Sequence, residues 1–257
     1  MTNKHLTVLT GASRGMGAAI AEQLLQPGQS LICISRTTNR GLAERAAGAG
    51  ATLEQWALDL ADATAAAQRV EDWLEAQSDD TFNSATLINN AAALTRLAPL
   101  EAAGTAELVR ALRVGLEAPL LLTSAFLRAT RSWRARRGGQ CKVLNISSGL
   151  GRSAMASQAS YCAVKAGMDH FSRAVALDQA HAPHPARIVS LAPGVIDTDM
   201  QVQLRAGDPA QFPDHARFVQ MKTSGQLDSP TTAAVKVIAF LQRPDFGSKP
   251  VADVRDA

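Results

Sequence analysis

A glycine-rich turn near the N-terminus restricts the fold of this chain more than any other feature. The apolar segment Leu6–Thr10 is followed by seven residues of this turn and then by an amphipathic helical segment, Ala18–Gln26. Glycines let the backbone approach a pyrophosphate closely, and a helix N-terminus offers amide donors and a positive dipole end. This order indicates a dinucleotide site, although the Gly-x-x-x-Gly-x-Gly spacing alone is equally compatible with a structural turn. The expected cofactor contacts here are Gly11, Ser13, Arg14, Gly15, Met16 and Gly17.

Apolar strand segments and helical segments alternate along the rest of the chain, which predicts an α/β fold. The length of 257 residues fits one α/β domain as well as two smaller domains. Residues 201–229 are polar and contain two prolines and two glycines, which indicates a mobile substrate lid of short helices beginning near residue 197. The further expected strands are Ser30–Ser35, one within Ala51–Leu58, Ala85–Ile88, Cys141–Ile146, Arg187–Leu191 and Pro250–Val254, and the further helices are Ala61–Ala76, Thr105–Arg131, one starting at Ser160, and Thr231–Leu241.

The charge after the second strand indicates which nicotinamide cofactor is bound. An acidic residue near this point bonds the ribose hydroxyls of NAD, whereas an arginine accommodates the 2′-phosphate of NADP. Arg36 stands here without an acidic neighbour, and Arg14 adds a second positive charge. Both residues favour NADP(H); the alternative is that they are two solvated arginines.

Polar and small residues follow several of the other strands, at the edge where ligands bind in parallel sheets. Asp59 has the chemistry to accept a bond from an adenine amino group, or to cap the next helix. Small residues after the fourth strand let the backbone approach a ribose, or simply form a turn. Thr198 is placed to bond a nicotinamide carboxamide. The cofactor set predicted at this edge is Asp59, Leu60, Asn90, Ala91, Pro193, Gly194, Ile196 and Thr198.

Tyr161 and Lys165 are four residues apart, so a helix places them on one face. A neighbouring ammonium favours the phenolate and lowers the pKa of a tyrosine, which suits it to protonate a carbonyl oxygen. Ser148 ends the fifth strand and is placed to bond the same oxygen, or to cap a loop. Val164, Met168, Phe171 and Val175 form an apolar stripe that can seat this helix on a sheet.

Composition argues against two other classes of partner. The net charge of +3 is mild, and the arginine cluster at residues 128–137 suits a helix C-terminus better than a nucleic acid. No apolar run is long enough to span a bilayer, and no signal peptide precedes the first strand. The three cysteines lack metal spacing, so we expect a cytoplasmic protein with no metal.

The motifs together resemble the short-chain dehydrogenase/reductase family over essentially the whole chain. They are Thr10-Gly-x-x-x-Gly-x-Gly17, Asp59-Leu60, Asn89-Asn90-Ala91, Ser148, Tyr161-x-x-x-Lys165 and Pro193-Gly194. The resemblance implies a single-domain Rossmann fold over residues 1–257, with a doubly wound parallel sheet of strand order 3-2-1-4-5-6-7. It also implies hydride transfer between NADP(H) and a carbonyl, with Ser148, Tyr161 and Lys165 as the catalytic set and Lys165 also binding the ribose. Members of this family usually dimerise through the fourth and fifth crossover helices, so a homodimer or homotetramer is expected.

Within the family, the C-terminal part is similar to sepiapterin reductases and bacterial benzil reductases. The similar stretches are Ala192–Gln201 and the lid with Phe212-Pro213, Lys222, Gly225-Gln226-Leu227 and Ser229-Pro230. The resemblance implies that the substrate is a small vicinal diketone or α-hydroxyketone. It also implies that Asp253 anchors the substrate alongside Ser148 and Tyr161, whereas Asp253 is otherwise an ordinary charge on an edge strand.

The chain departs from the family pattern at two positions. The small change of the family's Asn-Asn-Ala-Gly to Ala92 should be tolerated. Gly115 replaces the family's catalytic asparagine, which holds a relay water largely through its backbone carbonyl. Because Pro119 has no N–H, the Gly115 carbonyl should lack its helical partner and still accept a bond from water. We therefore expect an active enzyme; the alternative is a non-catalytic NADP(H)-binding sensor or scaffold.

Overall fold

The computed structural model describes residues 4–78, 81–137 and 140–256, without the side chains of Arg136 and Arg137. The strands are β1 His5–Thr10, β2 Gln29–Ser35, β3 Thr52–Ala57, β4 Ser84–Asn89, β5 Cys141–Ile146, β6 Arg187–Ala192 and β7 Val251–Asp253. The helices are α1 Gly15–Leu24, α2 Arg40–Ala49, α3 Ala63–Glu75, α4 Thr105–Leu112, α5 Ala118–Ala129, α6 Arg131–Arg137, α7 Ala159–Ala180, α8 Asp199–Arg205, α9 His215–Thr223 and α10 Pro230–Gln242.

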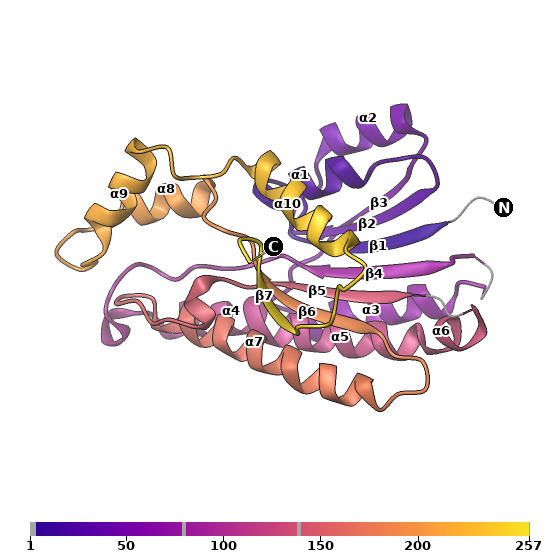
Figure 1. Cartoon of the computed structure of the whole chain (residues 1–257). Coiled ribbons are helices and arrows are strands. Elements are labelled where there is room, and N and C mark those ends of the chain that lie inside the picture. Colours follow the sequence, from indigo (N-terminus) through magenta and orange to yellow (C-terminus); the bar gives the residue numbers. More distant parts are fainter. Residues whose placement is uncertain (1–3, 79–80, 138–139, 257) are drawn as a thin grey trace.

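The seven strands form one sheet in the order β3-β2-β1-β4-β5-β6-β7, and every neighbouring pair is parallel. Helices α1, α2 and α10 cover one face, and α3, α4, α5 and α7 cover the other (Figure 1). This confirms the predicted doubly wound, single-domain Rossmann fold and its strand order. The order changes direction between β1 and β4, so the carboxyl ends of these strands frame the crevice in which such sheets bind ligands.

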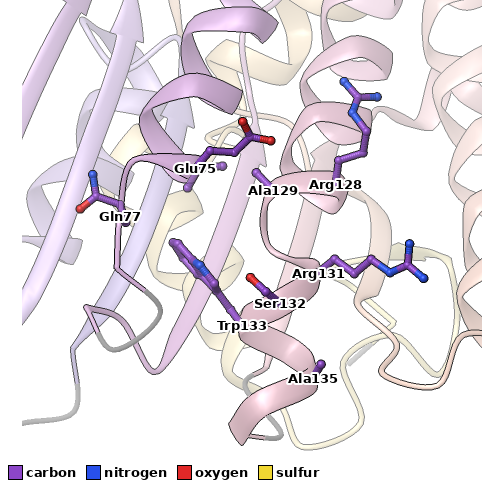
Figure 2. Close-up of a pocket in the computed structure, with 9 residues that line it drawn as sticks. Glu75, Gln77, Arg128, Ala129, Arg131, Ser132, Trp133 and Ala135 are labelled. Carbon is purple, nitrogen blue, oxygen red and sulfur yellow. The ribbon is translucent and has the colours of Figure 1, made fainter.

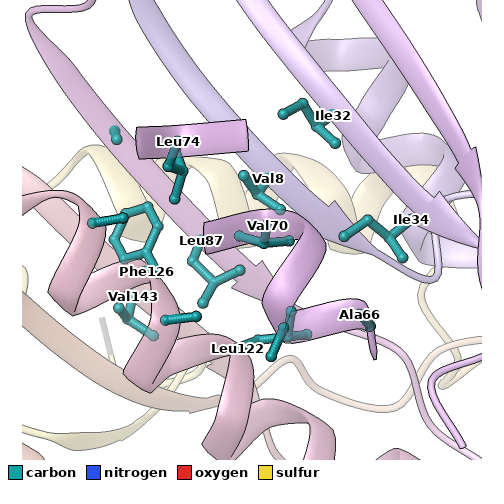
Figure 3. Packing of buried hydrophobic residues seen from close by; sticks show 14 of the residues in the cluster. Val8, Ile32, Ile34, Ala66, Val70, Leu74, Leu87, Leu122, Phe126 and Val143 are labelled. Atoms are coloured by element: carbon teal, nitrogen blue, oxygen red, sulfur yellow. The ribbon is translucent and has the colours of Figure 1, made fainter. Parts of the chain in front are cut away.

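Two apolar clusters hold the layers together. Val8, Leu87 and Val143 on the sheet pack against α3 and α5 (Figure 3). On the opposite face, Leu9 and Ile88 pack with residues of α1 and α10. Strands with both faces covered are continuous apolar runs, which is why the sequence pattern located all seven strands to within a few residues.

Two helical predictions need correction. Helix α2 was not expected; it begins where Asn39 Oδ1 accepts a hydrogen bond from the Leu42 amide at 3.3 Å, and Gly50 at φ 65° ends it. The single helix expected over Thr105–Arg131 is interrupted by a π-helical turn, Arg113–Glu117. Pro119 lies just beyond this turn and lacks the N–H that a regular α-helix requires there.

Helix α7 carries the apolar stripe as expected. Val164 and Met168 are buried, and Phe171 and Val175 pack partly buried against the first cluster. The helix therefore lies with one face on the sheet, and its N-terminal turns are positioned beside the end of β5 (Figure 1).

Candidate active site

Hydrogen bonds between side chains and backbone groups hold the glycine-rich turn against the end of β4. Asn90 Nδ2 donates to the carbonyl oxygens of Thr10 and Gly11 at 3.0 and 3.2 Å. The hydroxyl of Thr10 accepts from the amides of Asn90 and Ala91 at 2.9 and 3.0 Å. Asn90 and Ala91 thus lie against the turn itself, which adds a structural role to the contact with cofactor predicted for them.

Two of the three glycines in this turn are required by close packing. Gly11 has φ +71°, and a Cβ on Gly17 would lie 2.1 Å from the Gly11 oxygen, so α1 approaches the turn too closely for any side chain. Gly15 at φ +57° differs, because the nearest atom to an added Cβ is Thr198 Cγ2 at 3.8 Å. An added Cβ on Gly15 would thus make only an ordinary contact, so the positive φ is what favours glycine here, at the N-terminus of α1 where a pyrophosphate would bind.

The predicted phosphate-binding arginines differ in their surroundings. Arg36 is exposed at the end of β2. Arg14 Nη1 forms an exposed ion pair with Asp199 Oδ2 at 2.9 Å. Arg14 therefore ties the glycine-rich turn to the start of α8, and a cofactor phosphate would compete with Asp199 for it.

Asp59 has a partner that sequence reasoning missed. Its carboxylate accepts from Arg110 Nη2 of α4 at 3.0 and 3.1 Å and from the Ala61 amide at 3.0 Å. The Ala61 amide and the Arg110 and Arg36 guanidinium groups lower the pKa of this carboxyl. The cap of α3 is Asp62, and Leu60 is buried in the core, so only the backbone of Leu60 can face a cofactor.

Ser148, Tyr161 and Lys165 lie together at the carboxyl end of β5. Lys165 Nζ lies 5.5 Å from the centroid of the Tyr161 ring and donates to the Ile146 oxygen at 2.6 Å. Ser148 lies near the Tyr161 side chain, whose pKa it lowers, and accepts from the Leu150 amide at 3.2 Å. Both functions considered for Ser148, contact with Tyr161 and capping of a loop, therefore occur together.

The pKa of Tyr161 is opposite to the sequence expectation. Burial raises it to about 12, and the hydrogen bond from Ser148 offsets only part of this effect. Burial also lowers the pKa of Lys165 to about 8, while the Asp169 carboxylate raises it. Spacing placed the ammonium beside the ring correctly, but it did not reveal how strongly both groups are desolvated.

Gly115 lies inside the π-helical turn and faces α7. A Cβ at this position would lie 2.6 Å from Val164 Cγ1, so no side chain fits while Val164 keeps its place. The glycine is thus matched to its neighbour on the helix that bears Tyr161 and Lys165.

Asp253 ends β7, and its carboxylate is already engaged. Arg255 Nε and Nη2 donate to its two oxygens at 2.7 and 2.6 Å. Arg152 Nη2 lies 4.0 Å from the same carboxylate. A substrate anchored on Asp253 would therefore have to share it with Arg255.

The predicted lid consists of α8, α9 and the residues around them, and it has a small apolar cluster of its own. Leu97, Leu204, Phe212 and Phe218 are its buried members, and Met155, Met200 and Met221 pack against them. Leu97 follows β4 and Met155 follows β5 in the chain, so the lid rests on loops at the carboxyl edge of the sheet. The remaining predicted residues of this edge, Pro193, Gly194 and Ile196, lead from β6 into the lid.

The arginine cluster belongs to a different part of the molecule. Arg128 forms a two-bond ion pair with Glu71, and buried Arg134 donates to the His184 oxygen at 3.0 Å. A hollow of about 520 Å³ lies beside Arg128, Arg131 and Trp133, where α3 ends and α6 begins (Figure 2). This is the amino edge of the sheet, away from Tyr161. The side chains of Arg136 and Arg137 lie outside the described residues.

Comparisons with known proteins cover nearly the whole chain. Residues 5–209 match the family model described as short chain dehydrogenase. The chain is 34% identical over 239 residues to a benzil reductase ((S)-benzoin forming) of Bacillus cereus, with 93% of this chain and 94% of that protein covered. It is 31% identical over 259 residues to the sepiapterin reductase of Meriones unguiculatus, with 97% and 95% covered. A solved short-chain dehydrogenase/reductase from Burkholderia vietnamiensis is 34% identical with a TM-score of 0.63, covering 100% of this chain and 99% of that one.

Proposed function

The chain belongs to the short-chain dehydrogenase family, and we propose that it is an NADPH-dependent carbonyl reductase acting on vicinal diketones or α-hydroxyketones. The observation that carries this proposal is the grouping of Tyr161, Lys165 and Ser148 at the carboxyl end of β5. The names of the benzil and sepiapterin reductases support reduction of a carbonyl as the reaction class.

Tyr161 is the proton donor in this proposal, and its side chain in the neutral form suits that task. A phenol with a pKa of about 12 stays protonated at neutral pH and holds its proton for a developing alkoxide. Ser148, beside Tyr161, would bond the same substrate oxygen and stabilise negative charge as it develops. Lys165 contributes a positive charge beside the ring and a donor for a ribose. When bound, a reduced nicotinamide supplies the hydride.

NADP(H) is the proposed cofactor because of the charges around the end of β2. Arg36 is exposed there, and Asp59, the acidic residue that follows β3, is paired with Arg110. A 2′-phosphate would gain a cation at Arg36 without meeting an unpaired carboxylate. In the proposed complex, Asp59 accepts a hydrogen bond from the adenine amino group and retains its ion pair with Arg110, which holds the carboxylate in place.

The lid and Asp253 are the proposed substrate-facing elements. The apolar lid cluster suits an aromatic or alkyl diketone, and residues 197–229 are proposed to close over it. Asp253, held between Arg255 and Arg152, is proposed to orient a polar group of the substrate.

We also propose a homodimer or homotetramer in the cytoplasm. Val109 and Leu112 of α4 and Leu120 of α5 are large apolar side chains that are more than two-fifths exposed. We propose that these exposed apolar side chains contact a second copy of the chain. The three cysteines are free thiols, which fits a reducing compartment. Within the described residues, none of the helices combines the length and the apolar character needed to cross a bilayer.

The decisive assay follows NADPH absorbance with 1-phenyl-1,2-propanedione, with NADH in parallel. We expect oxidation of NADPH well above that of NADH, and a loss of about 10²–10⁴-fold in kcat/KM for Tyr161→Phe. NADPH binding by the variant should remain, because the ring and its packing are kept. Near-wild-type reduction by Tyr161→Phe would contradict the assigned role. Tight NADPH binding without turnover of any carbonyl would favour the sensor alternative.

A further inference from the structure

Asp169 is a buried carboxylate one helical turn beyond Lys165. The spacing of Tyr161, Lys165 and Asp169 places all three on one face of α7. The Asp169 side chain is 1% exposed, so its charge depends on the groups around it. Its Oδ1 accepts from Ser147 Oγ at 2.6 Å and from Ser190 Oγ at 2.7 Å, while Oδ2 has no hydrogen-bond partner among the described residues.

Asp169 completes a set of contacts that hold the end of β5 against α7. Lys165 Nζ donates to the carbonyl of Ile146, Asp169 accepts from the hydroxyl of Ser147, and Tyr161 lies near Ser148, which lowers its pKa. The last residue of β5 and the two residues after it therefore each face one of three successive turns of the helix. Loss of the middle contact would loosen Ser148 relative to Tyr161.

Arg152 neutralises the Asp169 carboxylate only in part, so the remaining negative charge acts on Lys165. Arg152 Nε lies 3.8 Å from Asp169 Oδ2, and its Nη2 lies 4.0 Å from Asp253 Oδ2. Arg152 is 34% exposed and is shared between two carboxylates, and Asp253 has Arg255 as a second partner. Neither ion pair of Arg152 is at hydrogen-bond distance, so Asp169 is only partly neutralised from that side. Ser147, which follows β5, and Ser190 of β6 contribute hydroxyls and no charge.

We propose that Asp169 is a positioning residue, whose buried carboxylate keeps Lys165 in its ammonium form and fixes the end of β5 beside Tyr161. This role rests on the proposed reductase function. It makes the charge itself necessary, because a neutral amide would still accept from Ser147 and Ser190. The nearby backbone is fitted to the carboxylate, since a Cβ on Gly151 would lie 2.7 Å from Asp169 Oδ2.

The Asp169→Asn variant separates charge from shape. In the wild type, kcat/KM for diketone reduction should fall as pH rises through the pKa of Lys165, about 8. Without the carboxylate this inflection should move to lower pH by at least about one unit, because an opposite charge at one-turn distance shifts a pKa by roughly that much. A loss of activity at every pH without movement of the inflection would show a merely structural role and overturn the proposal.

Ser190→Ala is the matched control. It removes one of the two hydrogen bonds to Asp169 Oδ1 and keeps the charge, so its inflection should coincide with that of the wild type. An inflection displaced equally in Ser190→Ala and Asp169→Asn would overturn the proposal, since hydrogen bonding would then account for both. Thermal unfolding of both variants establishes that the fold is retained.

A direct titration tests Asp169 without reference to activity. In protein labelled with [13Cε]lysine, the Lys165 signal is identified by its absence in Lys165→Met. Its midpoint should lie at lower pH in Asp169→Asn than in the wild type. Equal midpoints overturn the proposal whatever the enzyme reduces. A shifted midpoint in a chain that reduces no carbonyl would leave the charge coupling intact and remove the proposed function instead.

Discussion

Gly115→Ala is expected to destabilise the protein through a single contact. The added methyl group would lie 2.6 Å from Val164 Cγ1, roughly 1 Å closer than the usual distance between carbon atoms. Val164 is 3% exposed and sits on α7, where a valine has one strongly preferred rotamer and cannot turn away. Overpacking of this kind costs about 1–3 kcal/mol, offset by up to about 1 kcal/mol from the better helix propensity of alanine.

The clash predicts a coupling that equilibrium urea unfolding can measure. In a Val164→Ala background the space is open, so Gly115→Ala should become neutral or stabilising there. The double-mutant cycle should therefore show a coupling energy of about 1–3 kcal/mol, with the double variant more stable than the sum of the two single effects predicts. Equal effects of Gly115→Ala in the two backgrounds, within about 0.5 kcal/mol, would refute the assignment of Val164 as the group that excludes a side chain.

The same contact determines how the relay hypothesis must be tested. An asparagine at position 115 clashes with Val164, so Gly115→Asn alone would report on packing. The informative comparison is Gly115→Asn/Val164→Ala against Val164→Ala. If the Gly115 carbonyl supports the relay, turnover should change only a few-fold; a gain of orders of magnitude at unchanged NADPH affinity would show that the relay needs the asparagine side chain.

Two further predictions concern charge. Burial and the Lys142 ammonium lower the pKa of His5 from 6.5 to about 4, so the unfolded chain binds more protons between these pH values. The free energy of unfolding should accordingly fall by roughly 1–3 kcal/mol more in the wild type than in His5→Gln as pH decreases from 6.5 to 4, and equal slopes would contradict this. Arg36→Asp should lower kcat/KM with NADPH by at least about tenfold and raise it with NADH, since a carboxylate repels a 2′-phosphate and bonds ribose hydroxyls; an unchanged preference would remove Arg36 from the site.

The strands and the shared helix face of Tyr161 and Lys165 could be predicted because those features are local or depend on fixed spacing, whereas the strand order followed from the family resemblance. Buried parallel strands are apolar runs, and the four-residue interval between Tyr161 and Lys165 places them on one helix face. Asn39, a typical N-cap residue, is a local signal for α2 that the sequence also contains.

Features that depend on contacts between distant segments escaped prediction. Asp59 and Arg110 are 51 residues apart, and nothing in either segment indicates their ion pair. The raised pKa of Tyr161 depends on how many atoms surround it after folding. Asp169 carried one usable signal, an acidic residue one turn beyond Lys165 on the same helix, but its burial between β5 and β6 appears only in the folded chain.

The apolar cluster of the lid has a consequence for how the molecule opens. Its buried residues, Leu97, Leu204, Phe212 and Phe218, are separate from both clusters that join the sheet to its helices. We therefore expect the proposed lid to form a cooperative unit that can unfold while the sheet stays intact. Amide hydrogens of α8 and α9 should exchange with solvent through this sub-global opening, at a free energy well below that of β1 and β4. The segment that would enclose a substrate could then be exchanged as a whole for another segment. The new segment would have to keep the contacts with Leu97 and Met155.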